Sequence, residues 1–137
     1  MYSITKEVYF CYGHRLMSHP GKCKNLHGHS VKAAITLEAE RLNGQGMVCD
    51  FSELAGVSAA FIEAELDHNF LLHRDDPLVT LLRQADERFM VLPEHPTAEV
   101  IAKLIYDFLL AKGYPVREVS LWETASSCAS FGAASRR

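Results

Sequence analysis

Two stretches of the chain alternate between apolar and polar residues, and this alternation constrains the fold more than any other feature of the sequence. In residues 30–40, polar residues alternate with the apolar residues Val31, Ala33, Ile35, Leu37 and Ala39. Residues 2–16 show the same period, with Lys6 interrupting the apolar side. A period of two is typical of strands with one buried face, most often in antiparallel sheets. The sequence therefore predicts two long, half-buried strands.

Three stretches with helical spacing follow the second strand. In each, a residue that can cap a helix precedes the apolar positions: Asp50, Asp76 and Thr97. Gly113 ends the last of them. The expected helices lie in residues 50–64, 76–84 and 97–112, followed by a strand in 116–125 and a possible return of the chain in 130–135. This order of elements predicts an α+β fold.

Length and charge narrow the classes of protein. A chain of 137 residues is expected to form one domain, residues 1–137. With a net charge of -3, it lacks the basic surplus that nucleic acid or an anionic membrane would require, so we expect neither as a partner. The first ten residues carry charges where a secretory signal would be apolar, and no apolar run is long enough to span a membrane. The expected location is the cytoplasm.

Three histidines share the apolar side of the two predicted strands. His27 and His29 continue the parity of Val31 and Ala33, and His14 has the parity of Phe10. If the strands pair, the three imidazoles converge, and three imidazoles with an open position form a catalytic zinc site. By itself a His-x-His pattern is weak, because buried histidines are more often hydrogen-bonded core residues than ligands.

The cysteines are widely spaced, which favours four free thiols over a disulfide framework, and we expect most of them to be buried as small apolar side chains. Cys23 lies between Lys22 and Lys24, four residues before His27. Neighbouring cations or a metal lower the pKa of a thiol, so Cys23 suits a nucleophile or a base. It equally suits a fourth zinc ligand, which would make the site structural.

Two further features suggest proton transfer and ligand binding. Asp67 precedes His68 where the first long helix is expected to end, so the pair is either a proton-transfer unit or a polar pair at a helix end. Glu123 falls on the apolar side of the last predicted strand. A buried carboxylate needs partners, such as a basic side chain or the N–H groups of a ligand.

Six short motifs resemble the 6-pyruvoyltetrahydropterin synthase and 6-carboxytetrahydropterin synthase family. They are "HRL" at 14–16, "CKNLHGH" at 23–29, "VCDFSEL" at 48–54, "LDHNFL" at 66–71, "PTAE" at 96–99 and "WET" at 122–124. They occur in the family's order over nearly the whole chain. The resemblance implies the tunnelling fold, with a four-stranded antiparallel sheet and two helices packed on one face. It also implies a homohexamer, built as a dimer of trimers, with active sites between subunits.

The resemblance also assigns metal-binding, catalytic and substrate-binding roles to residues of this chain. It implies Zn²⁺ held by His14, His27 and His29, Cys23 as general base, Asp67 with His68 as a proton relay, and Glu123 and Thr97 at the pterin. Arg15, His19, Lys22 and Lys24 are candidates for binding triphosphate, although surface charges are commonly only solvated.

The implied substrate is 7,8-dihydroneopterin triphosphate. One family reaction retains a 6-pyruvoyl side chain, and the other releases acetaldehyde and gives 6-carboxytetrahydropterin on the route to queuosine. The three residues between Cys23 and His27 resemble the short spacing of the 6-carboxy enzymes, which we therefore favour. A pyruvoyl product, a metal-independent dihydroneopterin aldolase-like activity and a structural zinc module are the alternatives. Tyr12 and Ala98 depart from residues common in the family, and the segment 73–95 is long.

Overall fold

The computed structural model describes residues 1–133, in which a six-stranded mixed sheet carries the helices. The strand order across the sheet is β4-β3-β1-β2-β5-β6. The strands are β1 (Tyr2–His14), β2 (His27–Ala39), β3 (Asn69–His73), β4 (Phe89–Leu92), β5 (Val116–Trp122) and β6 (Cys128–Gly132). The helices are η1 (Lys22–Lys24), a short 3₁₀ helix, and α1 (Phe51–Glu65), α2 (Leu78–Gln84) and α3 (Ala98–Ala111).

The two strands predicted from alternation form the centre of the sheet. β1 and β2 pair antiparallel along their full length, from Tyr2 opposite Ala39 to His14 opposite His27. β2 begins at His27, three residues before the alternating stretch 30–40, so the His-x-His pattern lies within the strand. Extension of the ladder to this point places all three histidines on paired strands.

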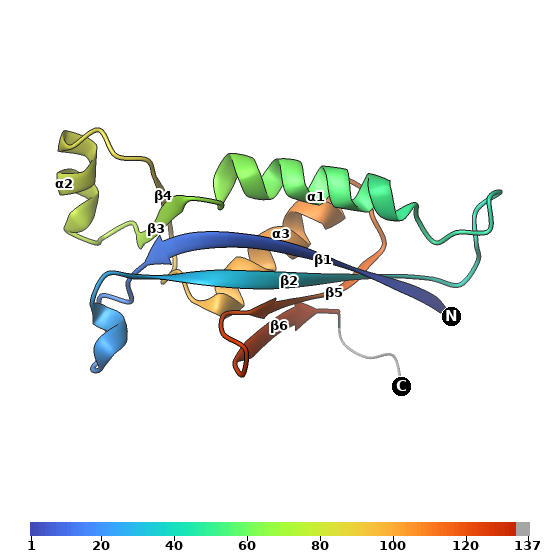
Figure 1. Cartoon of the computed structure of the whole chain (residues 1–137), viewed down its shortest axis with the longest axis horizontal. Coiled ribbons are helices and arrows are strands. Elements are labelled where there is room, and N and C mark those ends of the chain that lie inside the picture. The colour runs from blue at the N-terminus through green and yellow to red at the C-terminus, as the bar shows by residue number, and fades with distance from the viewer. Residues whose placement is uncertain (134–137) are drawn as a thin grey trace.

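The two long helices, α1 and α3, cover one face of the sheet (Figure 1). Phe61 of α1 stacks on Phe108 of α3, with ring centroids 4.2 Å apart. The core between this helix layer and the sheet contains fully buried residues such as Ile35, Leu54 and Ile101. The opposite side of the sheet is called the open face below. This face includes Tyr9, whose exposed fraction is 72%.

Two of the three predicted helix starts are confirmed. The start of α2 is one residue later than predicted, because its N-cap is Pro77 rather than Asp76, although Asp76 accepts the N–H of Leu78. Asp50 accepts hydrogen bonds from the N–H groups of Ser52 and Glu53, and Thr97 accepts one from Val100. Gly113 adopts a φ of +89°, a conformation that favours glycine and ends α3. None of the helices within residues 1–133 combines the length and the apolar character needed to cross a bilayer.

The expectation of a four-stranded antiparallel sheet is wrong in two respects. The sheet has six strands, and two of its strand pairs are parallel. β3 and β4 were not predicted, and each runs parallel to its neighbour, β3 beside β1 and β4 beside β3. These two strands have only five and four residues, too few for an alternation to be recognised in the sequence. The chain also has a third, short helix, α2, where the sequence predicted one.

The last predicted strand ends earlier than expected. β5 stops at Trp122, and the backbone N–H of Glu123 bonds to the carbonyl of Ser127 in the turn that leads to β6. β6 confirms that the chain returns after β5, although residues 134 and 135 of the expected return lie outside the described part of the chain. Glu123 therefore lies on a turn rather than within a strand.

Candidate metal centre and proton-relay pair

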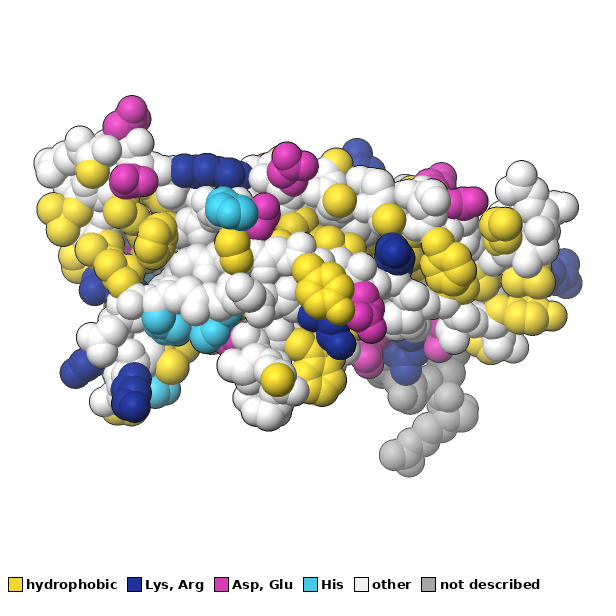
Figure 2. Space-filling model, viewed as in Figure 1, with side chains coloured by type: hydrophobic (Ala, Val, Ile, Leu, Met, Phe, Trp, Pro, Cys, Tyr) yellow, Lys and Arg dark blue, Asp and Glu magenta, His cyan; other side chains and the backbone are white. Residues whose placement is uncertain are grey.

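The three predicted histidines converge where the β1–β2 ladder ends. His14 lies directly opposite His27, and His29 follows two residues later on the same side of β2. The ring centroid of His14 is 4.5 Å from that of His27 and 5.1 Å from that of His29. Figure 2 shows histidine side chains at this end of the molecule, near basic side chains of the segment between β1 and β2. Strand register alone therefore brings the three imidazoles together.

The hydrogen bonds of two histidines fix the state of their rings. The Nδ1–H of His14 donates to the carbonyl of Pro96 at 2.7 Å, and the Nδ1–H of His27 donates to the carbonyl of Asn25 at 2.7 Å. A carbonyl only accepts, so in the neutral rings both Nε2 atoms carry lone pairs. These two Nε2 atoms lie 3.0 Å apart. Two lone pairs at this distance repel one another unless a cation or a proton lies between them.

Glu123 adds a carboxylate to the three histidines. Its Oε1 lies 2.7 Å from Nε2 of His29 and 3.4 Å from Nε2 of His14. When the His14 ring is protonated, its Nε2–H can donate to this carboxylate. That hydrogen bond and the positive charges of protonated histidines lower the pKa of Glu123 against the effect of burial, which favours the ionised carboxylate. One ligand atom from each of these four residues lies within 4.8 Å of the others. The donor set of three imidazoles and one carboxylate fits a divalent transition metal such as zinc.

Burial favours the neutral form of His29, one of the candidate metal ligands. Burial lowers the pKa of His29, and this effect outweighs the carboxylate of Glu123, which raises it. Metals bind the neutral imidazole, so the environment keeps His29 in the state that a metal requires.

Tyr12 is a neighbour of this centre that the sequence did not single out as functional. Its ring meets that of His14 edge-on, with centroids 5.1 Å apart, and lies 5.9 Å from that of His29. Its side chain is almost completely buried, and burial together with the charge of Glu123 raises the pKa of its phenol. Tyr12 has the same parity as His14 in β1, and this is the sequence signal that places it beside the histidines.

The segment before α3 holds one ligand in place. Pro96, in the predicted "PTAE" motif, is the residue whose carbonyl accepts from His14. Thr97, expected at the substrate, accepts the N–H of Val100 through its side chain and caps α3. The motif therefore connects the start of α3 to the metal centre through backbone and side-chain hydrogen bonds.

The second predicted pair, Asp67 and His68, also forms. Oδ2 of Asp67 lies 2.9 Å from Nδ1 of His68, in the turn between α1 and β3. A backbone hydrogen bond from Cys11 is the main cause that lowers the pKa of Asp67. The carboxylate thus orients the imidazole and leaves Nε2 of His68 available, because 78% of that side chain is exposed. This is the arrangement of an imidazole prepared for proton transfer.

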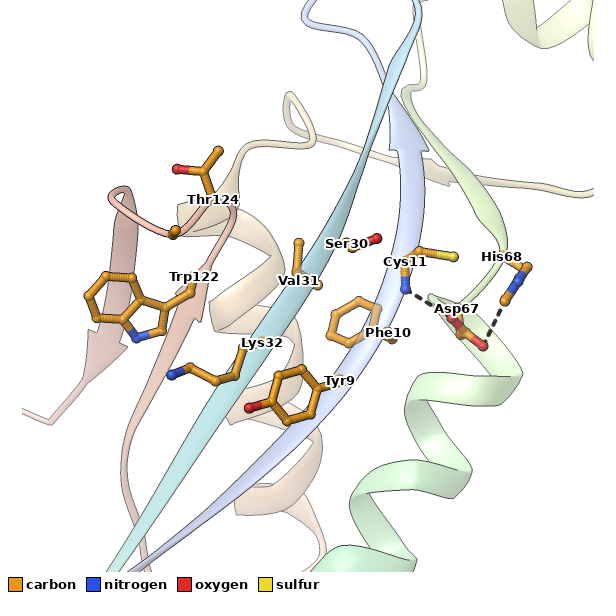
Figure 3. Close-up of a pocket in the computed structure, with 11 residues that line it drawn as sticks. Tyr9, Phe10, Cys11, Ser30, Val31, Lys32, Asp67, His68, Trp122 and Thr124 are labelled. Atoms are coloured by element: carbon orange, nitrogen blue, oxygen red, sulfur yellow. Dashed lines mark hydrogen bonds and ion pairs between the residues drawn. The ribbon is translucent and has the colours of Figure 1, made fainter.

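The thiol beside this pair is Cys11 rather than Cys23. Sγ of Cys11 and ligand atoms of Asp67 and His68 lie within 4.8 Å of one another (Figure 3). Cys23 lies on η1, and its carbonyl accepts the N–H of Leu16. Among residues 1–133, Cys23 belongs to neither group of converging ligand atoms. Within one chain, the predicted base is therefore separate from the predicted relay.

All four cysteines are free thiols, as the sequence predicted. The expectation that most of them are buried is wrong, because only Cys49 among them is buried. Cys11 and Cys23 are half-buried and Cys128 is exposed. The long β1–β2 ladder explains the exposure of Cys11, since Cys11 has the parity of the open face.

A hollow of about 680 Å³ extends over the open face beside Asp67 and His68. Tyr9, Lys32 and Trp122 line its other side (Figure 3). Lys32 lies over the ring of Trp122, 5.4 Å from the centroid. A second hollow of about 420 Å³ borders His27 and His29, and Cys11 lines both hollows. The relay pair lines only the first of these two hollows, and His14 and Glu123 line neither, so the two groups do not share a hollow within one chain.

Comparison with known proteins agrees with this geometry. A sequence model of the family described as "6-pyruvoyl tetrahydropterin synthase" matches residues 3–134. The chain belongs to this family. It is 33% identical over 135 residues to the 6-carboxy-5,6,7,8-tetrahydropterin synthase of Haemophilus influenzae, covering 93% of this chain and 96% of the relative. It is 37% identical over 123 residues to the enzyme of the same name from Aquifex aeolicus, covering 80% and 75% of the two chains.

A solved structure supports the fold assignment. The 6-pyruvoyltetrahydropterin synthase of Plasmodium vivax superposes with a TM-score of 0.71 at 22% identity, covering 95% of this chain and 96% of that one. The tunnelling fold expected from the resemblance is confirmed, with six strands in place of four. As a member of the tetrahydropterin synthase family, the protein is a pterin enzyme with a partly buried group of three histidines and a glutamate that could hold a metal.

Proposed function

We propose that the protein is a zinc-dependent 6-carboxy-5,6,7,8-tetrahydropterin synthase, which converts 7,8-dihydroneopterin triphosphate and water to 6-carboxytetrahydropterin, acetaldehyde and triphosphate. The names of relatives in Haemophilus influenzae and Aquifex aeolicus support this choice of product. The three-residue spacing between Cys23 and His27 supports it independently. The product then serves as a precursor of the deazapurine of queuosine, and the enzyme acts in the cytoplasm.

The pair of Nε2 atoms of His14 and His27 carries the metal part of the proposal. Both rings donate from Nδ1 to a carbonyl, and the free nitrogens face each other at 3.0 Å. This is how metal-binding histidines are commonly held, with the second ring nitrogen bonded to a carbonyl or a carboxylate. Three imidazoles favour zinc over the hard cations Mg²⁺ and Ca²⁺, which prefer all-oxygen sites.

Substrate binding and proton transfer are assigned to different residues of the chain. Bound zinc supplies a Lewis acid that polarises the side-chain hydroxyls of the substrate. The ionised carboxylate of Glu123 accepts hydrogen bonds from the 2-amino group and N3–H of the pterin. His68, oriented by Asp67 through Nδ1, accepts and returns protons at Nε2. Cys23 acts as the general base at the side-chain carbon.

A homohexamer, arranged as a dimer of trimers, brings these residues into one site. In one chain the histidines border one hollow and His68 lines another, while Cys23 lies on η1. A second subunit that places its Asp67–His68 pair opposite the histidines of the first would complete the active site. The edge strands β4 and β6 each leave one side of the backbone without a strand partner in the described chain, which suits pairing between subunits.

Product analysis tests the choice of reaction. The zinc-loaded protein is incubated with 7,8-dihydroneopterin triphosphate, and the products are separated by chromatography. We expect equal amounts of acetaldehyde and 6-carboxytetrahydropterin. A 6-pyruvoyl product without acetaldehyde would assign the protein to the other branch of its family. No consumption of the substrate would exclude both reactions.

A further inference from the structure

Cys11 joins the Asp67–His68 pair through bonds of its backbone as well as by the position of its thiol. Its N–H donates to Oδ1 of Asp67 at 3.0 Å, and its carbonyl accepts the N–H of His68 at 2.8 Å. These two bonds continue the pairing of β1 with β3, which begins at Tyr12 and Asn69. The turn after α1 is thereby fixed to the strand that carries the thiol, and three ligating side chains are held side by side.

The conformation of the turn is prepared before any ligand arrives. His68 has a φ of +53°, in the left-handed region that costs a non-glycine residue about 1 kcal/mol or more. The hydrogen bond from its N–H to Cys11 holds the residue in this conformation. A ligand that uses these side chains does not pay again for ordering the backbone, which favours tight binding.

The three donor atoms form a set that suits a soft or borderline divalent metal. A thiol sulfur, a carboxylate oxygen and an imidazole nitrogen lie within 4.8 Å of one another. None of the three residues belongs to the group formed by the histidines and Glu123. The thiolate and carboxylate together carry two negative charges, which balance a divalent cation. Mixed sulfur, nitrogen and oxygen ligands favour Zn²⁺ and Co²⁺ over Mg²⁺ and Ca²⁺.

An ion can reach this group from solvent. The side chain of His68 is 78% exposed and that of Asp67 is 28% exposed. Figure 3 shows the sulfur of Cys11 directed toward the side of β1 on which Asp67 and His68 lie, at the edge of the open-face hollow. The remaining coordination positions would be filled by water from this hollow.

We propose that Cys11, Asp67 and His68 form a second metal site, which binds Zn²⁺ or a similar divalent metal separately from the histidine centre. Binding replaces the proton of the Cys11 thiol with the metal, and that proton is released to solvent. Occupation also removes the free imidazole nitrogen from proton transfer. If the proposed synthase reaction is correct, zinc beyond the first equivalent therefore inhibits the enzyme.

Cobalt titration of the full-length, metal-free protein tests the site without relying on turnover. Co²⁺ bound to a thiolate gives a charge-transfer band in the near ultraviolet, whereas the histidine centre contains no sulfur. We expect two equivalents of Co²⁺ per chain, with the charge-transfer band developing during the second. The titration measures metal binding and not turnover. If the protein lacked synthase activity, the expected titration would be the same, so the proposed function and the second metal site can be disproved independently.

Variants identify the ligands. Cys11→Ser is expected to lose the charge-transfer band and the second equivalent while retaining the first. His68→Asn, in which asparagine tolerates the left-handed backbone, is expected to lose the second equivalent as well. Cys128→Ser, which removes an exposed thiol elsewhere, is the matched control and should bind as wild type does. A single equivalent in the wild type, or a band that survives in Cys11→Ser, would overturn the proposal.

Discussion

Glu123 lies within contact distance of two of the three histidines, so its side chain has two possible roles at the residue scale. Its carboxylate either binds the metal directly or is held beside it to receive the pterin. The 2.7 Å separation between Oε1 and Nε2 of His29 is compatible with both roles. The proposed function assigns Glu123 to the pterin and leaves the metal to the three histidines.

The substitution Glu123→Gln separates these two roles. We expect the variant to retain zinc, because three imidazoles remain, and to bind the pterin about 10- to 100-fold more weakly, because a neutral amide forms weaker hydrogen bonds than a carboxylate. Zinc content by elemental analysis and pterin binding by fluorescence titration give the two readings. His29→Ala provides the comparison. A similar loss of zinc in both variants would make Glu123 a metal ligand.

Part of the site was predictable from individual residues. The parity of His14, His27 and His29 with apolar neighbours predicted their convergence, and the structure places them together. The carbonyl of Pro96 and the thiol of Cys11 were not predicted as parts of either group. Pro96 approaches His14, and Cys11 approaches Asp67, through tertiary contacts between segments more than fifty residues apart. Such contacts leave no periodic pattern in the sequence.

At the scale of elements, the start of α3 connects helix stability with the metal centre. Thr97 caps the helix, and the neighbouring carbonyl of Pro96 holds His14. We expect Thr97→Ala to lower the free energy of unfolding by about 1 kcal/mol. Thr97→Ser should lower it much less, because serine retains the capping oxygen. Chemical denaturation measures both, and equal losses in the two variants would show that the hydroxyl does not cap the helix.

Asp76 connects α2 to the segment after β1. Its buried carboxylate accepts Nε–H of Arg15 at 2.8 Å and the N–H of Leu78 at 2.8 Å. Burial acts to raise the pKa of Asp76, but these hydrogen bonds outweigh it and lower the pKa. The bidentate pair also gives Arg15, one of the candidates for binding triphosphate, a partner within the chain.

This pair predicts a pH-dependent stability. A carboxyl group with a lowered folded-state pKa stabilises the protein above its unfolded pKa, about 4, and this contribution is lost as the pH falls toward the folded value. We expect Asp76→Asn to lower the free energy of unfolding by about 2 to 3 kcal/mol at pH 7. The difference from wild type should shrink below about pH 4. Urea unfolding of the metal-free proteins at both pH values measures this, and a constant difference would contradict it.

The element order was predictable where the local pattern is strong. The long strands β1 and β2 and all three α-helices occur where the periodicity predicted them, and the predicted caps of α1 and α3 are confirmed. β3 and β4 have neither, because a short parallel strand is defined by the neighbour it pairs with rather than by its own alternation. Asn69 and Phe89 therefore begin strands that only tertiary structure specifies.

At the scale of the whole molecule, the relay pair lines a hollow that none of the three histidines lines within one chain. The proposed hexamer joins the histidines of one subunit to His68 of another, and mixed oligomers test this arrangement. His29→Ala and His68→Ala are each expected to be inactive alone. After the two variants are dissociated and reassembled together, up to about a quarter of the sites should combine two intact halves and recover activity. No recovery in confirmed mixed oligomers would show that each chain uses its own relay.

Acetaldehyde release by metal-free and zinc-reconstituted protein tests the central claim most directly. The claim is that the metal held by His14, His27 and His29 is required for cleavage of the pterin side chain. We expect the metal-free protein to release no acetaldehyde and one equivalent of Zn²⁺ to restore release from 7,8-dihydroneopterin triphosphate. His29→Ala should stay inactive with zinc, whereas Glu40→Ala, which changes an exposed residue just after the other end of β2, should respond as wild type does. Acetaldehyde release at an unchanged rate from the metal-free protein would contradict the claim.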